Sequence, residues 1–275
     1  MRERQTISRD AFTLVEVLVV ISVLGLLLAV LMPALAGARS QAQGLVCRSN
    51  LRQLALAALG YATENDGYHV PGAEDMWDNA GRHRWHGTRK RLDEPFDPNS
   101  GPLVGYLADG RIRECPTGTP SARQNDWNTN FEHGGGGYGY NMAYVGSRLW
   151  DDGLHGPDAF QRAYARTTSN QEITGPGRTL LFADTAMAGA NDSLIEYSFA
   201  EPPFAVFGGR VMTDLWMSPS IHFRHDGQAN VAWADGHVGA EPMVPLDREN
   251  VYGADSAALG LGWFDPVDNT PFDLR

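Results

Sequence analysis

The sequence predicts an α+β protein, in which a long N-terminal transmembrane and stalk helix packs on a β-rich antiparallel head. Three observations predict this class: an unbroken apolar run over residues 12–32, a helical pattern that continues to about residue 62, and short apolar runs between glycines and prolines thereafter. The chain holds 31 Gly and 16 Pro, which favour turns over helices. We expect a leader at residues 1–11, a membrane span at 12–32, a stalk at 33–62 and a head at 63–275.

The apolar run FTLVEVLVVISVLGLLLAVLM extends from Phe12 to Met32. A helix needs about 20 such residues to cross a bilayer. The preceding MRERQTISRDA carries Arg2, Arg4 and Arg9, and positive charge before a first span keeps that end in the cytoplasm. The run therefore predicts a single-pass membrane protein whose remaining chain lies on the side away from the cytoplasm.

Glu16 is a charged residue near the start of this span. A carboxylate deep in lipid costs roughly 2.5–3.5 kcal/mol and less near the ends, so it generally marks a function or a partner charge. If the leader is cut after Ala11, the new amino group of Phe12 lies one helical turn away, in the same chain or in a neighbour. We expect the two charges to pair.

The string AFTLVEVLVVISVLGLLLAVLMPAL resembles the N-terminal signal of type IV prepilins and type II secretion pseudopilins. The resemblance implies that a prepilin peptidase cuts between Ala11 and Phe12, methylates Phe12 and leaves Glu16 as the fifth mature residue. The family usually has Gly where this chain has Ala11. The resemblance also implies a structural subunit, not an enzyme, which assembles with other pseudopilins or pilins into a filament and has a periplasmic head.

Other interpretations of the N-terminus stay open. Ala34, Leu35 and Ala36 offer a secretory signal-peptide site, and an uncut single-pass anchor is the second alternative. Neither explains Glu16. The alternative function is a membrane-tethered binding module whose periplasmic head takes a metal or another ligand.

The stalk pattern places apolar side chains at steps of three and four, which puts them on one helical face. We expect this face to pack on the head and the helix to end at the turn formers at 65–67. A helix broken at Pro33 is the alternative, because proline removes a helical hydrogen bond. The expected face consists of Cys47, Leu51, Leu54, Ala58 and Tyr61.

In the head, TLLFADTAM at 179–187 and NVAWADGHVGAEPM at 230–243 are predicted strands. Asp235 and Gly236 suit a hairpin turn, since Gly accepts positive φ, and Asp226 with Gly227 offers a turn upstream. We expect an antiparallel meander here. Four consecutive glycines at 134–137 lack the Lys of a phosphate loop, so we expect the tyrosines that follow them to pack.

His225, nine intervening residues, then Asp235 and Gly236 resemble the HX9DG motif of a prepilin-like bacterial group, domain of unknown function 1559. CRSNLRQL, ECPTGTP and YGYNMAY are also similar to that group. His225, Asp235 and His237 are candidate ligands for a transition metal, and His222 and Asp184 are further candidates. The alternative is that Asp235 makes the turn and His225 anchors it, with no cofactor.

Cys47 and Cys115 lack the spacing of a zinc site. If exported, they could form a disulfide, which in the chain-entropy model stabilises by roughly 4 kcal/mol; two separate buried thiols are the alternative.

A net charge of −11 opposes nucleic-acid binding. The basic run at 82–91 is followed by acidic residues, so we expect a solvated loop. No hydrolase or phosphate-binding signature occurs, which argues against an enzyme.

Overall fold

The computed structural model describes residues 13–76, 81–118, 132–189, 192–246, 249–250, 253 and 255–275. The predicted leader, with Ala11, and also Phe12 lie outside the described residues. The chain divides into two compact units, residues 1–42 and residues 43–275. Each unit is described by itself.

Helix α1 (Leu14–Glu64) contains Pro33 in its interior. The expected alternative of a break at Pro33 is therefore wrong: a proline costs one backbone hydrogen bond, and a long helix can lose one bond without ending. In the first unit, the apolar side chains of this helix are exposed. It is the one helix among the described residues that is long and apolar enough to cross a membrane.

In the second unit, α1 buries the predicted face against the head. Cys47, Leu51, Leu54 and Ala58 are buried, and Tyr61 is partly buried against the same core. The helix ends where predicted: the Gly67 amide, at a φ of 86°, donates to the Ala62 carbonyl. This left-handed residue closes the helix in the manner of a glycine C-cap.

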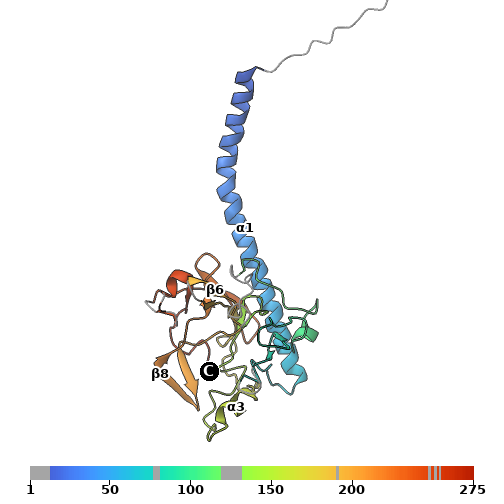
Figure 1. The fold of residues 1–275 in the computed structure, drawn as a ribbon, viewed down its shortest axis with the longest axis vertical. Helices are drawn as coiled ribbons and strands as arrows, with labels where there is room; N and C mark the ends of the chain where they lie inside the picture. The colour runs from blue at the N-terminus through green and yellow to red at the C-terminus, as the bar shows by residue number, and fades with distance from the viewer. Residues whose placement is uncertain are drawn as a thin grey trace, which may run out of the picture. The chain divides into compact units, whose positions relative to one another are not determined.

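The head is built from short strands with antiparallel pairing (Figure 1). Among the described residues, its largest sheet is the central one, with the order β11-β10-β4-β3, and four further sheets have two strands each. The central strands are β3 (Tyr138–Tyr140), β4 (Leu180–Asp184), β10 (Gln228–Trp233) and β11 (Val238–Pro242). The paired short strands are β1 (His83–Arg84) with β2 (Gly87–Thr88), β5 (Met187–Ala188) with β6 (Leu194–Ile195), β7 (Phe204–Phe207) with β8 (Arg210–Trp216), and β9 (Ile221–His222) with β12 (Leu261–Gly262). Short helices η1 (Val104–Tyr106), α3 (Ala159–Tyr164) and η3 (Ala257–Leu259) lie between strands.

The two strands predicted from their apolar runs are confirmed as β4 and β10, and β10 forms a hairpin with β11. The predicted meander is wrong in one connection. β10 pairs on its other side with β4, while β9 pairs with β12. The turn at Asp226 and Gly227 is present, since His225 and Gln228 bridge across it, but β9 ends at His222 and does not reach that hairpin.

Aromatic side chains fill the core between α1 and the central sheet. The expected packing of the tyrosines is confirmed, because Tyr138, Tyr140 and Tyr144 are buried. The Tyr140 ring stacks on Phe182 at 4.9 Å between centroids, and Trp85 lies 5.0 Å from the same Phe182 ring. The last residue, Arg275, is exposed, and its carbonyl accepts a hydrogen bond from the Arg178 guanidinium.

The expectation of a solvated loop at 82–91 is wrong for three of its members. Arg84, His86 and Arg89 are buried. Arg84 donates through Nε and Nη2 to the Glu132 carboxylate at 2.8–3.0 Å, and the Ser198 hydroxyl donates to the same carboxylate at 2.6 Å. A distant acidic partner, which local sequence does not reveal, makes burial of the guanidinium tolerable.

Candidate functional site

The beginning of α1 is organised by Glu16. Its carboxylate accepts hydrogen bonds from the Thr13 backbone amide at 2.8 Å and the Thr13 hydroxyl at 2.7 Å, while the Glu16 amide donates back to the hydroxyl at 3.3 Å. This is a capping box, which satisfies amides that a helix start leaves unpaired. The sequence analysis missed Thr13, although Thr-x-x-Glu before an apolar run is the signature of this cap.

Beyond this cap, residues 14–35 carry an apolar surface. Sixteen of its large apolar side chains are exposed: Leu14, Val15, Val17, Leu18, Val19, Val20, Ile21, Val23, Leu24, Leu26, Leu27, Leu28, Val30, Leu31, Met32 and Leu35. A soluble protein rarely exposes so large a contiguous apolar patch, which generally marks contact with a membrane or another protein.

The predicted metal ligands of the C-terminal motif, His225, Asp235 and His237, lie in two different places. Asp235 and His237 lie together in the β10–β11 turn, with 2.6 Å between Asp235 Oδ1 and His237 Nδ1. The same carboxylate accepts the His237 amide at 3.0 Å, and Gly236 has a φ of 88°. Both side chains of the pair are about half exposed, at 42% and 51%. This geometry is that of an Asx-type turn.

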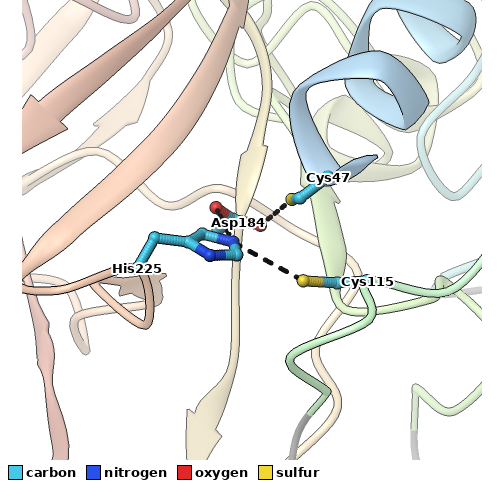
Figure 2. Close-up of side chains that lie close together, drawn as sticks. All are labelled: Cys47, Cys115, Asp184 and His225. Atoms are coloured by element: carbon cyan, nitrogen blue, oxygen red, sulfur yellow. Dashed lines mark hydrogen bonds and ion pairs between the residues drawn. The ribbon is translucent and has the colours of Figure 1, made fainter. Parts of the chain in front are cut away.

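His225 lies in a different cluster, with Cys47, Cys115 and Asp184 (Figure 2). The four ligand-type atoms are all within 4.8 Å of one another. The Cys47 thiol donates to Asp184 Oδ1 at 3.0 Å. His225 Nε2 lies 3.3 Å from Asp184 Oδ2 and 3.6 Å from Cys115 Sγ. Among the described residues, the group around His225 includes neither Asp235 nor His237.

Four separate segments position this cluster. Cys47 lies on α1, Cys115 on the loop after η1, and Asp184 at the last position of β4. His225 precedes a two-residue turn in which Asp226 and Gly227 both have positive φ, at 54° and 79°. Such a turn returns the chain sharply, and it aims the imidazole back at the end of β4 (Figure 2).

Burial and mutual contacts set the charges in the cluster. Burial disfavours the charged form of Asp184, but His225 and Arg224 hold its pKa below the usual value. Burial lowers the pKa of His225, yet the hydrogen bonds with Asp184 and Cys115 outweigh it and raise that pKa to about 9. The hydrogen bond with Cys47 lowers the pKa of Cys115 to about 4, whereas burial raises the pKa of Cys47. The cluster therefore holds two groups whose pKa is lowered, Asp184 and Cys115, beside two whose pKa is raised, Cys47 and His225.

For the two cysteines, the sequence leaves a disulfide and two separate buried thiols as alternatives. In the structure both are free thiols, and they share one cluster instead of lying apart. The disulfide remains a prediction. No local spacing could have revealed the cluster, because its members come from four distant parts of the chain.

Comparison with known proteins gives one family match, to the prokaryotic N-terminal methylation motif, over residues 8–32. No curated protein matches the chain, and no solved structure matches it either. The match does not reach His225 or Asp235, so the resemblance to the HX9DG group stays a prediction. Together with the apolar helix, the methylation motif supports a membrane-anchored protein of the type IV pilin or pseudopilin kind, which is a class of structural subunits.

Proposed function

We propose that this chain is a pseudopilin, a structural subunit that assembles through its N-terminal helix into a type II secretion or type IV pilus-like filament. A prepilin peptidase removes the leader between Ala11 and Phe12 and methylates Phe12. The observation that carries the proposal is that two features overlap in one segment. The methylation motif at 8–32 covers most of the part of α1 whose apolar side chains are exposed.

The exposed helix face has two successive environments in this proposal. Before assembly it lies in the inner membrane, where lipid covers it. After assembly, the helices of neighbouring subunits cover it. The apolar side chains stay out of water in both states, so transfer from membrane to filament needs little hydrophobic free energy.

Glu16 gives the transfer its specificity. Thr13 holds the carboxylate at the helix start, and the amino group of Phe12 in a neighbouring subunit is its partner during assembly. An opposite charge in a low-dielectric setting is attracted strongly, and an unpaired carboxylate there is costly. This pairing fixes the axial position of one helix against the next.

In this proposal the protein crosses the inner membrane once. Arg2, Arg4 and Arg9 keep the N-terminus in the cytoplasm, and the head is periplasmic. The partners are the prepilin peptidase, which is also the methyltransferase, and other pseudopilins or pilins. The chain has no role as an enzyme and binds no nucleic acid.

Glu16→Ala tests the assembly step in the native host, with Ser22→Ala as the matched control. Ser22 is a second polar residue of the span, and its hydroxyl donates only within the helix, to the Val19 carbonyl. We expect both variants to enter the membrane, because both spans remain apolar. Mild crosslinking followed by electrophoresis should give a ladder of multimers for wild type and Ser22→Ala, and a several-fold weaker ladder for Glu16→Ala.

Two results would count against the proposal. An equal ladder for Glu16→Ala would remove the role of the charge pair. The absence of a ladder in wild type, with the protein stably inserted, would favour the alternative of a membrane-tethered binding module.

A further inference from the structure

The cluster of Cys47, Cys115, Asp184 and His225 has no part in the assembly mechanism above. We propose that these four side chains bind one zinc ion, which ties the second half of α1 to the central sheet and to the loop after η1. The inference is independent of the proposed function, since it concerns the head alone.

Two of the separations within the cluster, from His225 to Asp184 and to Cys115, are close to those of a tetrahedral site. With ligand bonds of about 2.3 Å for sulfur and about 2.0 Å for nitrogen and oxygen, tetrahedral angles place N and O about 3.3 Å apart and N and S about 3.5 Å apart. His225 Nε2 lies 3.3 Å from Asp184 Oδ2 and 3.6 Å from Cys115 Sγ. Cys47 Sγ is 3.0 Å from Asp184 Oδ1, because a hydrogen bond joins them; zinc would replace that proton and widen the gap by about half an ångström.

The donor set selects zinc among the common divalent ions. Two thiolates and an imidazole are soft or borderline ligands that favour zinc, whereas calcium and magnesium prefer oxygen ligands. Four protein ligands complete a tetrahedron and leave no position for substrate, which is typical of a structural site. The burial of the four side chains is also typical of a structural site. Cys47, Cys115 and Asp184 are buried, and the His225 side chain is 9% exposed.

Outer-shell contacts hold the ligands in orientation. The Asn230 amide donates to Asp184 Oδ2 at 2.8 Å. Thr117 Oγ1 lies 3.4 Å from His225 Nδ1, the ring nitrogen that faces away from the cluster. A partner on the second ring nitrogen is usual for a metal-binding histidine, because it fixes the tautomer and the ring orientation.

The charges balance once an ion is present. Two thiolates and a carboxylate carry −3, zinc adds +2, and Arg224 beside the cluster offsets the remaining −1. Arg224 is held nearby, where its Nη2 donates to the Gly137 carbonyl at 3.1 Å. Such compensation matters because an unbalanced buried charge is costly.

The full-length protein, purified in mild detergent without chelator, tests this directly by elemental analysis and by counting alkylatable thiols after denaturation. We expect about one zinc per chain and no disulfide. Exchange for Co²⁺ should produce thiolate-to-cobalt charge-transfer absorption and the intense visible bands of a tetrahedral site. Reduced protein that fails to take up zinc, or native protein in which Cys47 and Cys115 are joined as a disulfide, would overturn the proposal.

His225→Gln and His237→Gln form a matched pair, since His237 is the exposed histidine of the same motif and pairs with Asp235. Zinc titration should show affinity at least about tenfold weaker for His225→Gln and unchanged for His237→Gln. Equal effects of the two substitutions would contradict the site. If His225→Gln fails to fold, the zinc content and the cobalt spectrum of wild type still decide the question.

Discussion

At the scale of single residues, the head buries several side chains that ordinarily carry charge. Burying a charge is costly, and Arg84 and Glu132 offset this cost by forming an ion pair. His69 and His86 avoid the cost because they are neutral when buried. Burial lowers the pKa of His69 to about 4 and brings the pKa of His86 well below its ordinary value. An arginine cannot lose its proton in a protein, so it requires a partner, whereas a histidine can be buried without one.

The neutral His69 makes stability depend on pH. Its folded-state pKa of about 4 lies below the ordinary 6.5, so between these values the unfolded chain binds more protons than the folded chain. The free energy of unfolding therefore falls as pH drops through this window, by up to about 1.4 kcal/mol per pH unit for each such histidine.

His69→Gln should therefore flatten the decline in stability between pH 6.5 and pH 4.5. The exposed His155 provides the control, because His155→Gln removes a histidine that stays in water. Chemical unfolding followed by tryptophan fluorescence at several pH values measures the slope. A slope for His69→Gln as steep as that of wild type and His155→Gln would contradict this account of buried histidine.

At the scale of elements, α1 is one helix with two sequence patterns. Residues 14–35 are apolar on nearly all sides and exposed, whereas from Cys47 onward one face is buried and consists mainly of apolar side chains. A helix that is apolar all round belongs in a membrane or a core, and an amphipathic one belongs on a surface. The two patterns assign different roles to the two halves.

Leu54 and Leu56 test this assignment within one turn of the same helix. Leu54 is 2% exposed and Leu56 is 53% exposed. Leu54→Ala should lower the free energy of unfolding of the head by about 2–5 kcal/mol because it leaves a cavity, and Leu56→Ala should change it by less than about 0.5 kcal/mol. All seven tryptophans lie beyond residue 76, so their fluorescence during chemical unfolding reports on the head. Equal losses would mean that the buried face is misassigned.

Local signals explain how much of the fold could be predicted from sequence. The helix end at 65–67, strands β4 and β10, and the turn at Asp235 and Gly236 all follow from residue types within a few positions. The pairing of β10 with β4, and of β9 with β12, does not, because partners in a sheet are chosen by packing across the whole head.

The candidate sites also differ in whether neighbouring residues or distant parts of the chain define them. Glu16 could be predicted as a site residue because a charge inside an apolar run is visible from its immediate neighbours. The methylation motif covers this residue. The cluster around His225 could not be predicted, since nothing near Cys47 or Cys115 shows that they meet Asp184. His225 was grouped with Asp235 and His237 from their closeness in sequence, while the turn at Asp226 and Gly227 directs it elsewhere.

At the scale of the whole molecule, the chain joins an apolar N-terminal helix to a folded head. The whole chain carries a net charge of −11, which favours solubility, while the exposed apolar side chains of residues 14–35 require lipid or other helices. In the proposed function, such a subunit is stored in the membrane, and its entry into a filament depends on processing at the N-terminus.

The terminal peptide of the native, membrane-bound protein tests that dependence most directly, by mass spectrometry. Cleavage after Ala11 predicts a chain that begins at Phe12 and carries an N-methyl group there. A chain that still begins at Met1, as an uncut anchor, or one that begins at Gly37, as a secreted protein, would contradict the assignment as a pseudopilin.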